Sequence, residues 1–196
     1  MRKLWCCVPM MILLLAACSG GSGVGKAEEL ALVIRGEYLE MTACTAKATV
    51  TADYGQRVYE YEMDVAVNGE ETTLAITAPE TVAGITAKVS GKDSRLEYED
   101  LSLETGPLNE DGLTPVSAVP ALLEAARSGY MTSCMLEDEE SGGLLRVDCG
   151  DPEGQPGVGT ETTLWFQPDT HDLVRGEIRS DGYRVILWEC SEFTKG

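Results

Sequence analysis

A cysteine at position 18 is the residue to which the sequence assigns the most definite chemistry. It follows Leu15-Ala16-Ala17, and two small residues before a cysteine are typical of a bacterial lipobox, where a secretory signal is cut. The Cys18 thiol would be the nucleophile that accepts a diacylglyceryl group, so no other side chain could replace it. The alternative is an ordinary cleaved signal peptide with a cysteine at this position by chance.

The segment before Cys18 has the layout of a signal peptide. Arg2 and Lys3 form a positive start, and Leu4–Leu15 form an apolar core that is too short to span a bilayer comfortably. We therefore predict a signal peptide over residues 1–17 and a flexible Gly/Ser tether over residues 18–25. The lipid on Cys18 would hold the protein at the extracytoplasmic face of the cell membrane, because two acyl chains anchor where one binds only marginally.

Four further cysteines lie outside the signal peptide: Cys44, Cys134, Cys149 and Cys190. An even number in an exported protein is consistent with disulfides. If Ser141-Gly142 centre a hairpin turn, Cys134 faces Cys149, which permits a strained disulfide or leaves two buried thiols. Cys44 and Cys190, on the first and last strands, would then be the second candidate pair.

Residues suited to catalysis or metal binding are scarce. The single histidine, His171, lies in the polar turn Pro168–Asp172, without a second histidine or an adjacent cysteine. This argues against a zinc site and a Ser-His-Asp hydrolase, and predicts a surface turn residue. The acidic run Glu137–Glu140 falls at an expected hairpin tip and lacks the spacing of a calcium loop. We therefore predict a protein that is not an enzyme and has no metal or cofactor.

The charge balance narrows the possible partners. The chain has 15 basic and 33 acidic residues, and removal of Arg2 and Lys3 with the signal peptide makes it more acidic still. Such a chain repels phosphate backbones, which excludes nucleic acid as a partner. It also repels anionic lipid headgroups, so we expect the body to stand away from the membrane surface.

The first half of the chain predicts one helix followed by a β-meander. Lys26–Glu40 has apolar residues at helical spacing, at Leu30, Ile34 and Tyr38 with Val33 beside them. The period then changes to two, and Asn68-Gly69 predicts a hairpin. The expected strands are 46–52, 59–67, 72–76, 85–89 and 95–98.

The second half predicts one more helix and further hairpins. Because Pro120 disfavours a helix interior, the regular helix is expected only from Val119 to Ser128. Asp181-Gly182 predicts a final hairpin, whose simplest register places Ile178 opposite Val185 and Arg175 opposite Trp188. Strands are expected at 132–136, 145–149, 160–167 and on both arms of the final hairpin, 173–193.

Helices with apolar stripes must cover an apolar sheet face. We therefore predict a single α+β domain over residues 26–196: a strongly curved antiparallel sheet, or incomplete β-barrel, of eight to eleven strands covered by two main helices. The inner face would carry the apolar side chains of the second and third strands. A filled core or a ligand cavity would both explain this pattern.

The middle of the chain resembles the LolA-like lipoprotein-carrier superfamily, in particular its membrane-anchored members. The resemblance rests on four runs, followed by an inserted helix, and covers about residues 26–135: Ala46-Lys47-Ala48-Thr49-Val50, Tyr59-Glu60-Tyr61-Glu62-Met63, Ile76–Ile85 and Leu96-Glu97-Tyr98. It implies an incomplete barrel around an apolar cavity for lipid or acyl chains, and no catalysis. This chain departs from the family in having few of its basic and aromatic positions.

Two functions follow as expectations. In the first, a surface lipoprotein binds an apolar or lipid-like ligand, such as an acyl chain, through van der Waals contacts with inner side chains. The residues expected to line that cavity are Tyr59, Tyr61, Met63, Val65, Leu74 and Ile76. In the second, the core is closed and the lipoprotein acts through contacts with an envelope protein partner.

Overall fold

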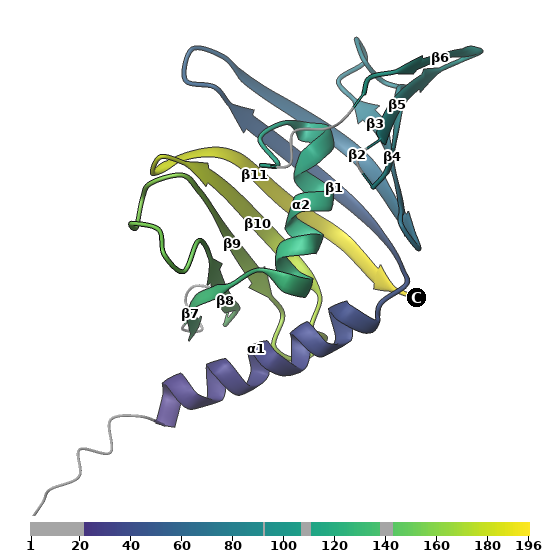
Figure 1. The fold of residues 1–196 in the computed structure, drawn as a ribbon. Coiled ribbons are helices and arrows are strands. Elements are labelled where there is room, and N and C mark those ends of the chain that lie inside the picture. The colour runs from purple at the N-terminus through teal and green to yellow at the C-terminus, as the bar shows by residue number, and fades with distance from the viewer. Residues whose placement is uncertain (1–21, 92, 107–110, 138–142) are drawn as a thin grey trace, which may run out of the picture.

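A computed structural model describes residues 22–91, 93–106, 111–137 and 143–196 (Figure 1). The predicted signal peptide, Cys18 and the first part of the tether lie outside these residues. The elements in chain order are α1 (Ser22–Glu40), β1 (Ala43–Asp53), β2 (Val58–Asn68), β3 (Glu71–Ala78), β4 (Thr86–Ser90), β5 (Asp93–Tyr98), β6 (Leu101–Glu104), α2 (Pro115–Ser128), β7 (Met131–Leu136), β8 (Leu145–Cys149), β9 (Thr160–Phe166), β10 (Leu173–Ser180) and β11 (Tyr183–Lys195).

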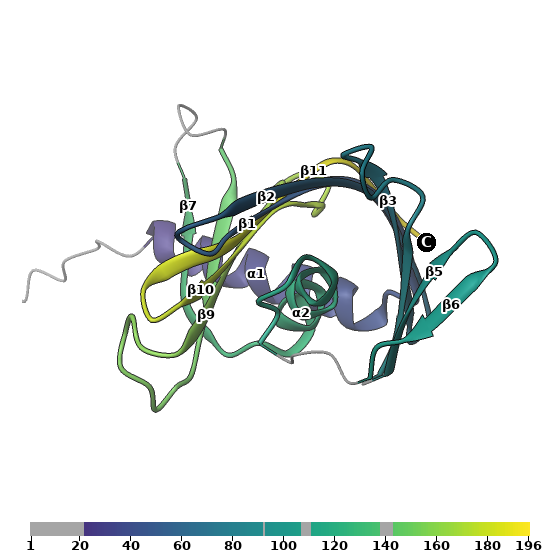
Figure 2. The ribbon, with the colours of Figure 1, turned by 90° about the horizontal axis from the view of Figure 1, so that it is seen from above.

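The described strands form one antiparallel sheet of 11 strands in the order β6-β5-β4-β3-β2-β1-β11-β10-β9-β8-β7. The first strand therefore pairs with the last, and β6 and β7 are the two open edges. The sheet curves around α2, which lies on its concave side, while α1 crosses one end (Figure 2). The predicted α+β class, with a curved sheet that does not close and two helices, is confirmed.

The strongest sequence pattern, the alternation in β1, gives the predicted buried row. Five side chains of β1 point into the core, and the facing row of β2 becomes buried from Met63 onward. The predicted hairpin after β2 is present, with Asn68 paired to Glu71 and a turn at Gly69-Glu70. Gly69 has a φ of 62°, which suits a residue without Cβ. The buried residues of β1 are Cys44, Ala46, Ala48, Val50 and Ala52.

Helix α1 begins earlier than predicted, and its buried stripe includes the predicted Ile34 and Tyr38, with Leu30 half-buried against the core. It starts at Ser22, so the second half of the expected tether is helical. Ala27, Ala31, Ile34 and Tyr38 are buried, whereas Val33 is half-exposed on the outer side. Among the described helices, none has the length and apolar character needed to cross a membrane.

Helix α2 contains Pro120, so the prediction that it would start at Val119 was wrong. The helix begins at Pro115 after a capping box, in which Thr114 and Ser117 exchange side chain-to-backbone hydrogen bonds of 3.2 and 3.1 Å. An interior proline costs about 3 kcal/mol because its ring clashes and its N–H is missing. Burial of one face of α2 against the sheet and α1 offsets this cost.

Two arginines join the ends of the helices. Arg127 of α2 donates from Nε to the carbonyl oxygen of Tyr38 in α1, at 3.1 Å. Arg35 of α1 donates to the carbonyl oxygen of Gly129, which ends α2. Positive charge at helix C-termini is favourable, so the two helices cap each other. Gly129 itself tolerates no side chain, because a Cβ would lie 2.7 Å from the carbonyl oxygen of Ala125.

The final hairpin has a register different from the predicted one. A β-bulge between Ile178 and Arg179 shifts the pairing by one residue, so Ile178 faces Ile186 and Gly176 faces Trp188. The predicted Arg175–Trp188 contact is therefore wrong. Strand β6 was also missed, because its four residues carry no strong strand pattern beyond two leucines.

Candidate ligand cavity and exposed surfaces

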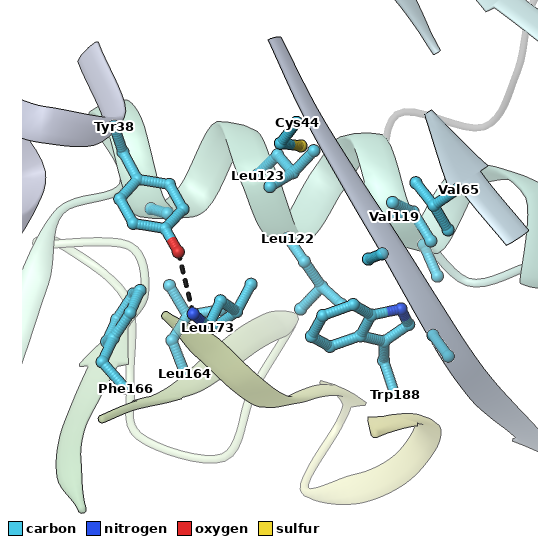
Figure 3. Packing of buried hydrophobic residues seen from close by; sticks show 14 of the residues in the cluster. Tyr38, Cys44, Val65, Val119, Leu122, Leu123, Leu164, Phe166, Leu173 and Trp188 are labelled. Carbon is cyan, nitrogen blue, oxygen red and sulfur yellow. Dashed lines mark hydrogen bonds between the residues drawn. The ribbon is translucent and has the colours of Figure 1, made fainter. Parts of the chain in front are cut away.

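The expected ligand cavity lies between α2 and the concave face of the sheet. Figure 3 shows Leu122 and Leu123 of α2 above Trp188 of β11 and Leu173 of β10. Gly176 of β10 makes this approach possible, because a Cβ there would lie 2.6 Å from Leu122 Cδ2. The helix therefore packs directly on the backbone of the sheet.

This interior is filled. The void that remains under α2 is about 10 Å³, which is at the lower limit for holding a single water molecule. Its lining is apolar and comes from α2, β1, β2, β10 and β11: Cys44, Ala46, Val65, Val119, Leu122, Leu123, Leu173, Trp188 and Phe193. An acyl chain does not fit there while α2 stays in this position.

The predicted ligand residues are brought together on β2 and β3. Met63 pairs with Ile76 and Val65 pairs with Leu74. Met63, Val65 and Leu74 are each at most 3% exposed, and they belong to the same core as α2. Tyr61 and Ile76 are half-buried at its margin, and Tyr59 is 38% exposed. Met63, Val65 and Leu74 thus face the core as the sequence predicted, whereas Tyr59 lies at the exposed end of the row.

A row of tyrosines leads from this core to the tip of the β1–β2 hairpin. The ring centroids of Tyr61 and Tyr59 are 6.5 Å apart, and those of Tyr59 and Tyr54 are 6.2 Å apart. Tyr54 donates from its hydroxyl to the carbonyl oxygen of Leu113, at 3.0 Å, just before α2. The row therefore links the hairpin tip to the start of α2.

One polar atom in the core lacks a partner. The indole Nε1 of Trp188 is buried and has no hydrogen-bond partner among the described residues. A buried N–H in this state costs about 1–3 kcal/mol. The ring still contributes large apolar area, which keeps the side chain in the core.

The β5–β6 apolar surface consists of Tyr98, Leu101 and Leu103. They share one face of the hairpin, since Leu101 pairs with Tyr98 and Leu103 with the half-buried Leu96. Leu101 is 74% exposed and Leu103 is 64% exposed. Three large apolar side chains thus remain accessible beside an edge strand, where unpaired backbone groups can bind another strand.

The convex face of β8–β11 carries a buried charge that sequence reasoning missed. Glu177 is 2% exposed and contacts Arg175, Arg179 at 2.9 Å and Arg184 at 3.2 Å. Burial alone would raise the pKa of Glu177, but the arginine hydrogen bonds hold it below its usual value. The signal was the spacing of Arg175, Glu177 and Arg179 on one face of a strand.

Trp165 of β9 completes this convex cluster. The guanidinium of Arg175 lies 4.6 Å from its ring centroid and that of Arg146 lies 5.7 Å away. Its Nε1 donates to Glu137 at 3.0 Å. Trp165 is therefore satisfied and only 6% exposed, although it points away from the core.

His171 lies in the β9–β10 turn, where it joins α1 to the body. Its Nδ1 is 2.7 Å from Glu37 Oε1, and Lys195 Nζ is 2.8 Å from Glu37 Oε2. The hydrogen bond from Lys195, with His171 beside it, lowers the pKa of Glu37. No group of three His, Cys, Asp or Glu residues suited to a metal occurs among the described residues.

All four cysteines of the body are free thiols. Cys134 pairs with Val147 rather than with Cys149, because the whole β7–β8 ladder is displaced by two residues from the expected register, as the pairing of Leu136 with Leu145 shows. In the β1–β11 ladder, Cys44 faces Lys195, whereas Cys190 faces Ala48. The two cysteines of each candidate pair are therefore not opposite each other in their ladders. Burial raises the pKa of Cys44, Cys149 and Cys190 to about 11.

Three open hollows lie elsewhere among the described residues. One of about 480 Å³ lies under the loop 151–159 and includes Arg146 and Asp148. A second, of about 880 Å³, lies between the β1–β2 and β10–β11 turns and includes Tyr54 and Tyr183. A third, of about 350 Å³, includes Lys47, Asp64 and Glu192. All three hollows contain charged side chains, so none has the apolar lining expected for an acyl chain.

Solved structures share this arrangement along most of the chain. An uncharacterized conserved protein from Thermus thermophilus has a TM-score of 0.50 at 10% identity, over 87% of this chain and 88% of that one. A LolA superfamily protein from Nitrosomonas europaea has a TM-score of 0.45 at 12% identity, over 86% and 92%. The chain thus shares its fold with the Thermus thermophilus protein.

The lipoprotein LppX of Mycobacterium tuberculosis is also similar to this chain. The TM-score is 0.42 at 18% identity, over 85% of this chain and 95% of LppX. No protein-family model matches the chain, and no curated protein matches its sequence. At these identities the likeness concerns the fold and assigns no activity.

Proposed function

We propose that this protein is a membrane-anchored envelope lipoprotein, held by a lipid on Cys18, that acts without catalysis by binding another protein. The observation that carries the proposal is the filled interior. Binding pockets for small molecules commonly measure about 300–1,000 Å³, whereas the void under α2 measures about 10 Å³. A LolA-like body without a preformed cavity has only its surface with which to act.

The β5–β6 apolar surface is the part of that surface best suited to a protein. Leu101 and Leu103 alternate along an open edge strand, which is the pattern that strand addition recognises. The turn beside them carries Glu99 and Asp100, and the whole chain has a net charge of −18. The partner we propose is therefore an extended segment with alternating apolar side chains and basic neighbours.

A photo-crosslinking amino acid at Leu101 of the full-length lipoprotein tests this contact in cells. We expect an adduct with one partner protein, and Leu103→Lys should abolish it by adding positive charge at the contact. Val158→Lys is the matched control, since Val158 is 60% exposed in a distant loop. A probe at Leu101 that gives no more adduct than a probe at Val158 would contradict the proposal.

A second candidate function is the binding of an apolar ligand, such as an acyl chain, after α2 moves. The apolar lining of the void under α2 favours it. Exposing Val119, Leu122 and Leu123 would cost about 5–9 kcal/mol in total, and burying a sixteen-carbon chain contributes about 12 kcal/mol. Met63, Val65 and Leu74 would then form the wall of the site, with Tyr61, Ile76 and Tyr59 toward its exit.

The two functions are separated by a lipid extraction. Residues 22–196, which contain all the described elements, are purified from cells, extracted with organic solvent and examined by mass spectrometry. The apolar-ligand function predicts a co-purified lipid and displacement of a fluorescent fatty acid, both reduced by Val65→Trp. A clean extract with no saturable probe binding would exclude it and leave the protein contact.

A further inference from the structure

Helix α1 has an outer side that nothing in the described structure covers. Leu32 is 59% exposed, Val33 50% and Leu39 60%, and all three point away from the buried stripe. Gly36 lies among them on the helix surface, and a Cβ there would meet no atom within 4 Å. The outer side of α1 therefore presents three large apolar side chains around Gly36, which has no side chain.

The position of α1 in the chain decides what this side meets. Ser22 follows Cys18 by four residues, so the helix starts within about 14 Å of the sulfur that would carry the lipid. The lipid fixes Cys18 at the level of the membrane headgroups. The first turn of α1 is therefore held at the membrane surface, and its 19 residues extend about 28 Å from there.

The rest of the molecule fixes how α1 is presented. Its inner stripe packs on the body, Arg35 and Arg127 join it to α2, and Glu37 joins it to the β9–β10 turn. The helix crosses one end of the sheet, and the β10–β11 turn lies at the opposite end (Figure 1). A membrane in contact with α1 would thus leave the β10–β11 turn directed away from it.

We infer that α1 lies flat on the membrane, with Leu32, Val33 and Leu39 in the headgroup region, in place of the expectation from net charge that the body stands away from the membrane. The inference rests on the lipoprotein part of the proposed function. The exposed charged residues of α1 are one basic residue, Lys26, and three acidic residues, Glu28, Glu29 and Glu40. Their net negative charge repels anionic lipids, so the helix should prefer a zwitterionic membrane surface. The lipid supplies retention, while the apolar side of α1 supplies orientation, because tethering makes a weak second contact effective.

Tryptophan reporters in the full-length lipoprotein test the orientation. Gly36→Trp places a ring at the middle of the outer side, and Tyr183→Trp places one in the β10–β11 turn, where Tyr183 is 79% exposed. The protein is bound to phosphatidylcholine vesicles whose acyl chains carry bromine, which quenches nearby tryptophan emission. The Gly36→Trp emission should be quenched about threefold more than the Tyr183→Trp emission, because interfacial helices sit about 5–10 Å into the headgroup boundary. An upright α1 would hold Gly36 about 20 Å farther out and leave it unquenched.

Further variants separate the contribution of the apolar outer side of α1 from the contribution of the lipid. Adding Leu32→Glu and Leu39→Glu to Gly36→Trp should abolish its excess quenching while the protein stays on the vesicles. Adding Val58→Glu, at a position 60% exposed on β2, should leave the quenching unchanged. The mass of the purified protein reports the diacylglyceryl group on Cys18, and its absence would refute the lipoprotein itself. A lipidated protein with equal quenching at both reporters would overturn the orientation of α1 alone.

Discussion

The two faces of strands β9–β11 exclude water in different ways. On the concave face, Gly176 admits Leu122 of α2, and packing fills the space without a polar partner for Trp188. On the convex face, Glu177 is equally buried, but it is covered by arginine side chains whose charged ends reach water. Shape complementarity stabilises the first face and charge pairing the second. The concave face should therefore be sensitive to volume, and the convex face to pH.

Leu122→Ala should break the concave face most severely. The side chain is 1% exposed and packs against Gly176 and Trp188, so its loss leaves a cavity that the rigid sheet cannot close. We expect the free energy of unfolding to fall by about 2–5 kcal/mol. Urea denaturation of residues 22–196 measures the change.

Leu39→Ala is the matched control for Leu122→Ala. Leu39 is on the other helix and 60% exposed, so its truncation in the same unlipidated protein should change the free energy of unfolding by less than about 0.5 kcal/mol. Equal losses for the two variants would show that α2 is not packed on the sheet as described.

Glu177→Gln should weaken the convex face by a smaller amount. The three arginines lose their shared anion, but each is more than a third exposed and can turn toward water. We therefore expect a loss of about 1–3 kcal/mol, below the value for a fully buried ion pair. Glu189→Gln, at an exposed position on β11, should be nearly neutral. A neutral effect of Glu177→Gln would mean that the cluster contributes solubility rather than stability.

The sequence predicted the concave face better than the convex one, for a physical reason. Alternation fixes which side chains of β1 and β2 point inward, and those assignments hold in the structure. Alternation carries no information about register. A two-residue displacement of the β7–β8 ladder moved Cys134 away from Cys149, and a bulge after Ile178 moved Arg175 away from Trp188. Polar contacts between strands depend on register, so the contacts of Glu177 with Arg184 and of Arg175 with Trp165 could not be predicted.

The state of the predicted cavity could not be predicted either. Alternation places Met63 and Val65 on the inner face whether that face meets a helix or a ligand. The decisive feature is the approach of Leu122 to Gly176, and those two residues lie 54 positions apart. The start of α2 was misplaced for a related reason, because local propensity at Pro120 was weighed without the tertiary burial that overrides it.

The pH dependence of the free energy of unfolding should distinguish the concave face from the convex face, because a change of pH alters the charge of Glu177 but not the volume of any side chain. The pKa of Glu177 is lowered in the folded protein from its reference of 4.5, so it favours folding above that value. This stabilisation should be lost as the pH falls through the lowered folded pKa. The unfolding free energy of Leu122→Ala should therefore fall in acid as the unmodified protein's does, whereas that of Glu177→Gln should fall less. Parallel acid profiles for all three proteins would assign the acid sensitivity to other carboxylates, such as Glu37.

The two tryptophans of the body, one on each face, give the most direct comparison of the faces and the smallest expected difference in stability. Trp165→Phe and Trp188→Phe remove the same atoms from two buried rings. At Trp165 the change also removes the hydrogen bond to Glu137 and weakens two cation–π contacts. At Trp188 it removes an N–H that has no partner, so the gain from its loss partly offsets the cavity. Trp165→Phe should therefore destabilise the protein by about 1 kcal/mol more than Trp188→Phe, as measured by urea denaturation at neutral pH. If Trp188→Phe were the more harmful change, its indole N–H would have a partner, and the concave face would depend on a polar contact after all.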